Sequence, residues 1–377
     1  MSAWPGKYVI GLTGNIATGK SVVRKMLENL GAYGIDADAL AHRAIAQGAP
    51  GYLPVVDTFG RWILSRDGQI DRSKLGRIVF SDPEALARLE AILHPLVGGA
   101  IDLLVRRSRH TVIVVEAIKL LESGLGERCD AIWVAVAPFE VQLARLTGKR
   151  GLSEAAANQR IAIQRPQAEL IAAAHVVIYN ERSFTRTWRQ VLAAWQKTVP
   201  GKVELPATSV ESIRGKMVVR RATPRQADEI AAFVTCLPQG RREVSTDDIM
   251  AAFGEKAYLL LKIDERLVGL VGWKVENLVA RVDEIFLEPS IPYREAIRTL
   301  VEKIEADSGE LQCEAALVFL PPDLSERDDI WHELGYQPRS IHSLDVRAWQ
   351  EAASESMPVG STLLFKQLRE ERVLRPV

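Results

Sequence analysis

The stretch that decides the fold of the first half of the chain is Tyr8-Val-Ile-Gly-Leu-Thr-Gly-Asn-Ile-Ala-Thr-Gly-Lys-Ser21. It opens with an apolar run, and from Ser21 to Leu30 apolar residues recur at helical spacing. Between the run and the helix, residues 14–21 match the pattern of Gly, four residues, then Gly-Lys-Ser. Strand, glycine-containing loop and helix in this order predict a P-loop, whose backbone N–H groups wrap a phosphate at the start of the helix.

This loop supplies the candidate nucleotide ligands. Lys20 is expected to reach the β- and γ-phosphates, and the Ser21 hydroxyl is expected to ligate Mg²⁺. The full predicted set is Gly14, Asn15, Ile16, Ala17, Thr18, Gly19, Lys20, Ser21 and Val22. The motif indicates a nucleoside triphosphate and leaves the acceptor open, because small-molecule kinases, GTPases and motor ATPases all carry it.

Acidic residues that follow the next two apolar runs favour a kinase. A kinase must orient or deprotonate an acceptor hydroxyl, and ligands of open α/β sheets bind at the carboxyl ends of the strands. Asp36 and Asp38 end the second run, with Asp38 predicted as the catalytic base and Asp36 in a supporting or Mg-water role. Period-two alternation would point both to one side, whereas the alternative is a helix N-cap pair. Glu116 ends the third run and is predicted to hold Mg²⁺ through water, the alternative being a solvated strand end.

A basic cluster and the remaining periodicity complete the first domain. Arg145, Lys149 and Arg150 precede Gly151, as expected of a mobile lid whose cations neutralise the transferring phosphoryl group; a solvated basic helix face is the alternative. Further strands are expected at 111–115, 130–136 and 175–179, and helices at 81–94, 138–146 and 154–164. Strands alternating with helices predict an α/β doubly wound parallel sheet.

The whole chain is expected to form two domains. Its 377 residues are too many for one typical domain, and the stretch 197–216 has several prolines and glycines and no sustained hydrophobic periodicity. The predicted division is therefore a first domain at 1–200, a linker at 201–216, a second α/β domain at 217–345 and a tail at 346–377. The tail is expected to contain one helix and an extended piece. Strands are expected at 217–221, 258–263, 267–275, 281–287 and 315–320, the second and third as a hairpin, and a helix at 295–306.

Composition limits the partners and the compartment. Lys plus Arg and Asp plus Glu are 48 each, so no global field attracts nucleic acid or an anionic membrane. The cysteines are odd in number and widely spaced, which predicts reduced core residues: Cys129, Cys236 and Cys313. The first residues lack a basic region followed by an apolar stretch, so a cytoplasmic enzyme is expected.

From about Val9 to Asn180 the sequence resembles the dephospho-coenzyme A kinase family. Beyond the loop, the resemblance is carried in order by Ile35-Asp-Ala-Asp-Ala-Leu-Ala-His42, Phe59-Gly60, Asp67-Gly-Gln-Ile-Asp-Arg72, Leu75, Val79-Phe80, Leu89, Ile92-Leu-His-Pro95, Leu120 to Leu125, Glu122, Cys129-Asp130, Pro138, Gln142, Arg145, Gln164 and Asn180. The resemblance implies transfer of the ATP γ-phosphate to the ribose 3′-hydroxyl of dephospho-coenzyme A, with Mg²⁺.

The resemblance also implies residue roles. Asp38 matches the proposed base, Lys20 the loop lysine, and Arg150 or Arg145 the lid arginine. Arg72 and His94 would help to form the acceptor site, and Asn180 would lie near the adenine pocket. His94 is equally well interpreted as a satisfied helix end. The chain departs from the family at Asn15, Ala17, Glu116, Ile118-Lys119 and His175. The change at Ile118 and Lys119 falls in a segment that the resemblance places near the acceptor.

Residues 217 to about 340 resemble the GNAT acyltransferase superfamily. The resemblance is carried by Arg220-Arg-Ala-Thr-Pro-Arg-Gln-Ala-Asp228, Asp283-Glu-Ile-Phe-Leu-Glu-Pro289 and Trp331-His-Glu-Leu-Gly-Tyr336. Where that superfamily clasps a pyrophosphate, this chain has Pro292, Glu295 and Ile297; proline lacks a donor and Glu repels phosphate. We therefore expect a degenerate GNAT-like domain without acetyl transfer, serving as a folding aid, an oligomerisation surface or a weak regulator, with Glu284 as an exposed strand carboxylate.

Three functions are compatible with the sequence. The first is a dephospho-coenzyme A kinase fused to an inactive acyltransferase-like domain. The second is a P-loop kinase of another nucleoside or small metabolite, which the Ile118-Lys119 change would favour. The third is a non-catalytic nucleotide or coenzyme A sensor, against which the combined presence of Lys20, Ser21 and Asp38 argues.

Overall fold

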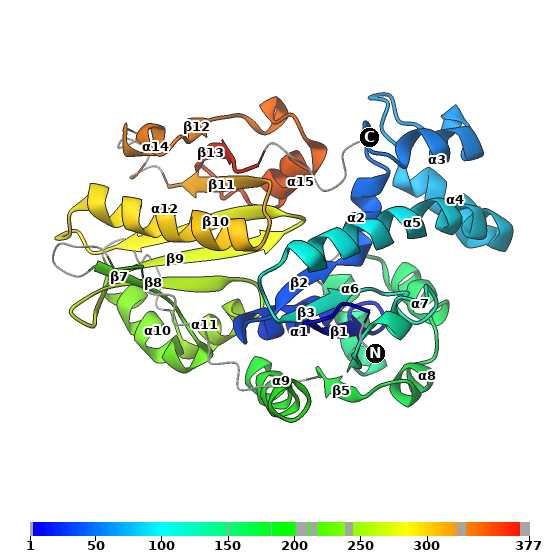
Figure 1. Cartoon of the computed structure of the whole chain (residues 1–377), viewed down its shortest axis with the longest axis horizontal. Helices are drawn as coiled ribbons and strands as arrows, with labels where there is room; N and C mark the ends of the chain where they lie inside the picture. The colour runs from blue at the N-terminus through cyan, green and yellow to red at the C-terminus, as the bar shows by residue number, and fades with distance from the viewer. Residues whose placement is uncertain are drawn as a thin grey trace.

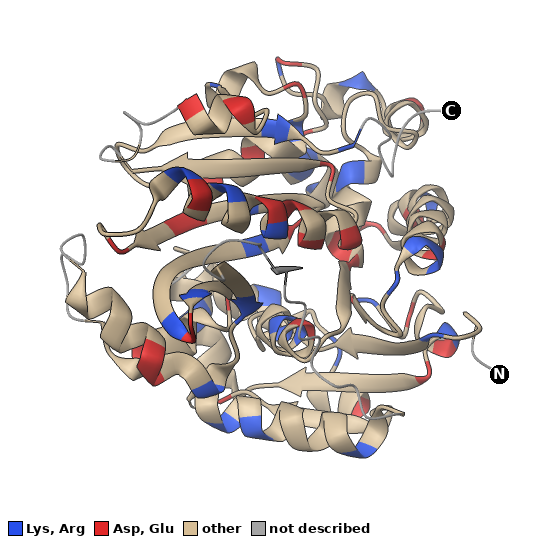
Figure 2. Cartoon of the chain, turned by 60° about the vertical axis from the view of Figure 1, so that its left-hand side comes forward, with Lys and Arg blue, Asp and Glu red and all other residues tan. Residues whose placement is uncertain are grey.

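The computed structural model shows two β-sheets, each covered by helices (Figure 1). It describes residues 3–148, 151–181, 183–200, 210–211, 217–237, 244–321, 324 and 329–369. In the view of Figure 2, basic and acidic residues are interspersed along both parts of the chain, in agreement with their equal totals.

The first sheet has five parallel strands in the order β2-β3-β1-β4-β5, which confirms the predicted doubly wound fold. Its strands are β1 Tyr8–Thr13, β2 Tyr33–Asp36, β3 Val112–Glu116, β4 Ala131–Val136 and β5 Val176–Tyr179. Every residue of β3 and β4 is buried, as expected of strands covered on both faces. Helices α1 Lys20–Asn29 and α9 Phe184–Thr198 pack on one face; α2 Ala37–Ala44, α5 Pro83–Arg107 and α8 Gln167–Ala172 pack on the other.

A helical region projects from the carboxyl edge of this sheet and has its own small core. It contains α3 Tyr52–Phe59, η1 Arg61–Ile63, α4 Arg72–Ser81 and the first half of α5. Asp82 caps α5 by accepting from the Glu84 N–H at 2.9 Å. The helix is longer than predicted and passes through Pro95, because its later turns bury residues such as Ile101 and Leu104 against the sheet. The remaining elements of this half are η2 Gly126–Arg128, α6 Phe139–Gly148 and α7 Glu154–Ala162.

The second sheet has eight strands in the order β12-β13-β11-β10-β9-β8-β7-β6. They are β6 Val210–Glu211, β7 Met217–Arg221, β8 Ala257–Ile263, β9 Arg266–Glu276, β10 Val279–Leu287, β11 Ala315–Leu320, β12 Gln337–Pro338 and β13 Thr362–Gln367. β8 and β9 form the predicted hairpin, and β10 pairs in parallel with β11. Helix α12 Tyr293–Glu310 packs on one face. The other face is covered by α10 Ala227–Cys236, α11 Thr246–Ala252 and α15 Arg347–Ser356; η3 Pro224–Gln226, α14 Asp329–Glu333 and η4 Ile341–Ser343 complete the chain.

Several details differ from the sequence-based expectations. The predicted tail does contain one helix and one extended piece, but the extended piece is β13, which pairs with β11 inside the second sheet. The short strand β6 lies within the predicted linker and pairs with β7. Cys313 is buried, Cys129 is half-buried and Cys236 is exposed, so the prediction of a core position is wrong for Cys236, which ends an amphipathic helix on its outer side. Within the described part of the chain, every helix is too short or too polar to traverse a lipid bilayer.

Candidate functional site

The loop between β1 and α1 has a backbone that requires glycine at two positions. Gly14 and Gly19 have φ of 149° and 90°, and Ala17 also has a positive φ, of 60°. A Cβ at Gly14 would lie 2.2 Å from the Ala135 carbonyl oxygen, and one at Gly19 would lie 1.9 Å from Asn180 Nδ2. The two glycines therefore provide both conformational freedom and the room in which β4 and the segment after β5 support the loop.

Two predicted site residues, Arg145 and Asn180, hold this loop from outside. The Asn180 side chain donates to the Thr18 carbonyl oxygen at 2.9 Å, and Arg145 donates to the carbonyl oxygens of Ala17 and Asn180, both at 2.9 Å. Thr187 in turn donates to Asn180 Oδ1 at 3.1 Å. Arg145 belongs to α6 and braces the loop backbone, whereas Arg150 and Lys149 lie outside the described residues.

Lys20 begins α1 and is almost fully buried, with 8% of its surface exposed. Its ammonium donates to the Asn15 carbonyl oxygen at 3.3 Å, which places it inside the curve of the loop. The segment after α7 also reaches the loop: Gln164 Oε1 accepts from the Ile16 N–H at 2.6 Å, and Asn15 Nδ2 donates to the Arg165 carbonyl oxygen at 2.9 Å. Gln164 thus contacts one of the N–H groups predicted to bind phosphate.

Glu116 and Ser21 meet at the carboxyl edge of the sheet. Glu116 is buried, and its Oε1 accepts from the Ser21 hydroxyl at 2.9 Å. Arg24 Nε donates to Glu116 Oε2 at 2.6 Å, and Arg24 also pairs with Glu28 at 2.8 Å. Burial by itself lowers the pKa of Arg24, but Glu28 and Glu116 raise it overall, so the guanidinium stays charged.

Sequence reasoning missed Arg24, although the sequence held a signal for it. Arg24 is four residues after Lys20, so the two share a face of α1, and the helix directs it toward the same sheet edge as the loop. Of its three acidic neighbours, Glu28 lies one turn further along α1 itself, whereas Glu116 comes from β3 and Asp36, at 3.9 Å, from the end of β2. Only tertiary contacts could identify Glu116 and Asp36.

Asp36 and Asp38 do not alternate along one strand, so that interpretation is wrong. Asp36 ends β2 and caps α2, accepting from the Ala39 N–H at 2.9 Å, which confirms the alternative interpretation for this residue. Asp38 lies in the first turn of α2, where its Oδ2 accepts from the Ile118 N–H at 3.1 Å. Burial, and next the Asp36 charge, raise the pKa of Asp38 to about 6, although Lys20 is close enough to oppose the rise. A carboxylate with this pKa is suited to accept a proton near neutral pH.

The residues predicted for the acceptor, Arg72 and His94, lie on α4 and α5, close to α2. Arg72 begins α4 and lies near His42 of α2, whose pKa is lowered by burial and by the Arg72 charge. His42 was not predicted as a site residue, yet it follows Asp38 by one helical turn. His94 is exposed on α5, one turn after Glu90, which accepts from the Lys119 ammonium at 2.6 Å.

The donor groups fit Mg²⁺ held partly by nucleotide and water. The Ser21 hydroxyl and the Glu116 carboxylate are hard oxygen ligands in contact with each other, and Asp36 is at the neighbouring strand end, in register with Glu116. The described residues contain no cluster of three or more His, Cys, Asp or Glu side chains suited to hold a metal. This arrangement resembles a site completed by substrate phosphates rather than an all-protein cage.

The parallel sheet order, the glycine loop with its buried lysine, and the acids at the adjacent strand ends define a P-loop nucleotide-binding protein with phosphotransfer geometry. A family model described as dephospho-CoA kinase matches residues 8–185. The dephospho-CoA kinase of Geobacter metallireducens is 45% identical over 194 residues, which are 51% of this chain and 96% of the relative. The chain therefore belongs to the dephospho-CoA kinase family.

Solved structures are similar to parts of the chain. The structure of TT1252 from Thermus thermophilus is 32% identical, covers 52% of this chain and 99% of its own, and has a TM-score of 0.48. An acetyltransferase of the GNAT family from Staphylococcus aureus Mu50 is 11% identical, covers 41% of this chain and 99% of its own, and has a TM-score of 0.33.

Proposed function

We propose that this chain transfers the γ-phosphoryl group of ATP to the ribose 3′-hydroxyl of dephospho-coenzyme A. The observation that carries the proposal is the convergence of Lys20 and Asp38 at one edge of the sheet, where the Lys20 charge lowers the pKa of Asp38 against the effect of burial. The membership of the dephospho-CoA kinase family supports the same acceptor. A non-catalytic sensor would need the phosphate loop but would have no need of the Asp38 carboxylate beside it.

The residues divide the work between charge stabilisation and proton transfer. The Asp38 carboxylate accepts the proton of the 3′-hydroxyl as that oxygen bonds to the γ-phosphorus and the bond to the β-phosphate oxygen breaks, releasing ADP. Lys20 and the loop N–H groups bind the β- and γ-phosphates, and Arg150 of the lid would neutralise transferring charge. Arg72 and His94 lie on the acceptor side, while Arg145 and Asn180 keep the loop in shape beside the adenine.

Magnesium would be held by the Ser21 hydroxyl, with Glu116 and Asp36 accepting hydrogen bonds from its water ligands. When bound, it neutralises charge on the β- and γ-phosphates. Arg24 donates to Glu116 at 2.6 Å, which fixes the orientation of the carboxylate. We therefore assign Glu116 an orienting role next to Ser21.

We propose two domains, residues 1–200 and a second that begins at 217 after the linker 201–216 and includes the tail through β13. The second domain is proposed not to transfer acetyl groups. Pro292 stands at the N-cap of α12 and offers no N–H group, Glu295 places a negative charge in its first turn, and Ile297 is 1% exposed. Homo-oligomerisation through this domain is proposed and is measurable by light scattering.

The enzyme is proposed to act in the cytoplasm on free nucleotides, without nucleic acid or membrane. The described cysteines are all unpaired, in keeping with a reducing compartment.

A coupled assay tests the proposed function. Purified chain with ATP and Mg²⁺ is given dephospho-coenzyme A, a panel of nucleosides, or no acceptor, and ADP release is followed. We expect ADP release only with dephospho-coenzyme A, and the product should carry one added phosphate on the ribose by mass spectrometry. Faster turnover of another nucleoside would assign a different acceptor, and ATP binding without turnover would assign a sensor.

A further inference from the structure

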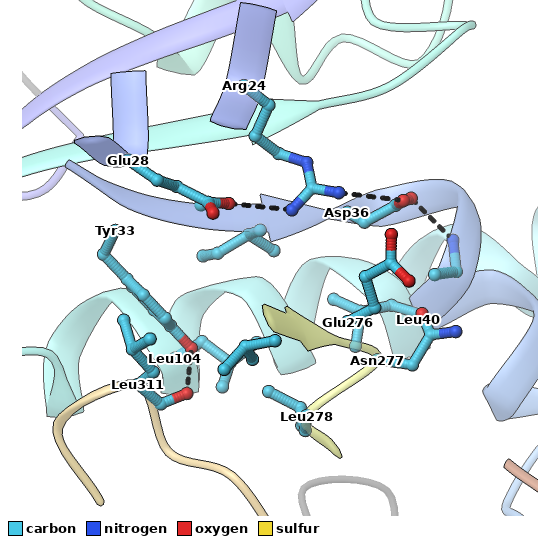
Figure 3. A pocket seen from close by; sticks show the side chains of 14 residues that line it. Arg24, Glu28, Tyr33, Asp36, Leu40, Leu104, Glu276, Asn277, Leu278 and Leu311 are labelled. Carbon is cyan, nitrogen blue, oxygen red and sulfur yellow. Dashed lines mark hydrogen bonds and ion pairs between the residues drawn. The ribbon is translucent and has the colours of Figure 1, made fainter. Parts of the chain in front are cut away.

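The second domain contacts the two helices that carry the phosphotransfer site. The kinase half alone matches 96% of the length of a relative that is 45% identical, so the second half is an addition to that enzyme. Its contacts with the first half include the turn between β9 and β10, residues 276–279, and the neighbouring Glu314. We call residues 276–279 the β9–β10 turn. Figure 3 shows this turn opposite Arg24 and Asp36 across a small cavity of about 40 Å³, which is too small for a nucleotide.

One set of contacts ends on α2. Arg43, in the last turn of α2, donates to Glu314 Oε2 at 2.6 Å and to the Asn277 carbonyl oxygen at 2.8 Å. Glu314 is fully buried, and its own N–H donates to the Leu278 carbonyl oxygen at 2.7 Å. Because α2 has only eight residues, a clamp on Arg43 restrains the whole helix, including Asp38 in its first turn.

A second set of contacts ends on α1. Lys25 donates to the Val275 carbonyl oxygen at 3.0 Å and to Glu28 at 2.7 Å. Glu28 pairs with Arg24, which orients the Glu116 carboxylate that accepts from Ser21. A continuous series of buried, charge-assisted hydrogen bonds thus joins β9 to the predicted magnesium ligand.

The β9–β10 turn itself shows that this contact is specific. Asn277 and Leu278 both have left-handed φ, of 53° and 61°. The turn between β8 and β9 has the same backbone form, with φ of 48° at Asp264 and 65° at Glu265, yet it carries polar residues and the Glu265 side chain is 71% exposed. Leu278 is 8% exposed and belongs to the core cluster of the first domain, together with residues of α2 and α5. A leucine in an unfavourable backbone region is therefore explained by its packing on the kinase.

We propose that the β9–β10 turn and Glu314 position the phosphotransfer site: they hold α2, and with it the Asp38 carboxylate, at the angle that turnover requires. This proposal rests on the proposed kinase activity. It makes the added domain a built-in support of catalysis, with Arg43 and Glu314 as positioning residues that touch neither substrate.

We call the contacts of Leu278, Asn277 and Glu314 with the first domain the clamp. Two variants test the clamp without weakening the β9–β10 hairpin. Leu278→Gly suits the left-handed backbone better than leucine and removes only the contact with the kinase core. Glu314→Gln removes the charge opposite Arg43. Each is expected to lower kcat with dephospho-coenzyme A about tenfold or more, because small misplacements of a catalytic group are costly, while leaving KM for ATP unchanged.

Matched controls separate positioning from stability. Glu265→Gly changes the equivalent residue of the β8–β9 turn, and Lys366→Met breaks a half-buried pair with Glu305 at 2.7 Å inside the second domain. Both should keep the parent kcat. The acid limb of the kcat profile should move below the parent midpoint in Leu278→Gly, because a loosened α2 exposes Asp38 to water. Unchanged kcat and pH profile in both clamp variants, or equal losses in the controls, would overturn the proposal.

Hydrogen exchange of the α2 amides measures how firmly the clamp holds this helix, independently of enzyme activity. Amides of α2 should exchange at least tenfold faster in Leu278→Gly than in the parent or in Glu265→Gly. If the parent does not phosphorylate dephospho-coenzyme A, the proposed function fails, whereas the exchange result still decides whether the turn restrains α2. Equal α2 exchange in all these proteins would refute the clamp.

Discussion

Replacing Asp38 by Asn should abolish most turnover and at the same time stabilise the protein above neutral pH. Burial and the Asp36 charge raise the pKa of Asp38 to about 6 from 3.8. In the pH range between those values the unfolded chain has lost this proton and the folded chain retains it, so folding stability falls as pH rises through the range. Above about pH 6, ionised Asp38 lowers the free energy of unfolding by a constant amount of at most about 3 kcal/mol, at about 1.4 kcal/mol for each pKa unit.

The neutral Asn removes this cost and keeps an oxygen that can accept from the Ile118 N–H. The variant should therefore melt higher at pH 8, by about 2 to 4 °C for each kcal/mol regained, and the advantage should vanish toward pH 4. Its kcat should fall by about 10²- to 10⁴-fold, the range typical of a general base, with ATP affinity nearly unchanged.

Calorimetric melting of parent and variant from pH 4 to 8 checks the predicted stability, and kcat measured over the same pH range checks the predicted loss of turnover. The parent kcat should decline on the acid side with a midpoint near the Asp38 pKa of about 6. A stability difference that is independent of pH would show that Asp38 does not titrate as proposed, and a variant with substantial turnover would remove it from the role of base.

Three further changes probe the nucleotide side of the site. Lys20→Ala should weaken ATP binding and turnover together, measured by calorimetric titration; an affinity loss equal to that of Asp38→Asn would contradict the separate roles of the two residues. Glu116→Gln should destabilise the fold by about 3 kcal/mol in urea titrations, because it leaves the buried Arg24 charge undercompensated; a change below 1 kcal/mol, itself about the size of an exposed ion pair, would argue against the pairing. Gln164→Ala should tighten ATP binding severalfold, because it frees the Ile16 N–H for phosphate; weaker binding would instead make Gln164 a nucleotide ligand.

Local sequence patterns were sufficient for most of the first domain. The glycine loop, the apolar strands and the amphipathic helices depend on spacing along the chain, so β1, β3, β4 and α1 lie where periodicity predicts them. The start of α2 is an exception. Asp36 could end a strand or cap a helix, and it does both, because the helix begins at the next residue and moves Asp38 off the strand.

The chain alone therefore determined that a triphosphate loop stands between the first strand and its helix, and that carboxylates follow the neighbouring strands, because strand, turn and helix signals are local. Only the tertiary structure decided which charges pair, as with Arg24 and Glu116, and that a leucine from a distant turn completes the kinase core. Such contacts join residues far apart in sequence, and their strength comes from burial that no single segment can provide.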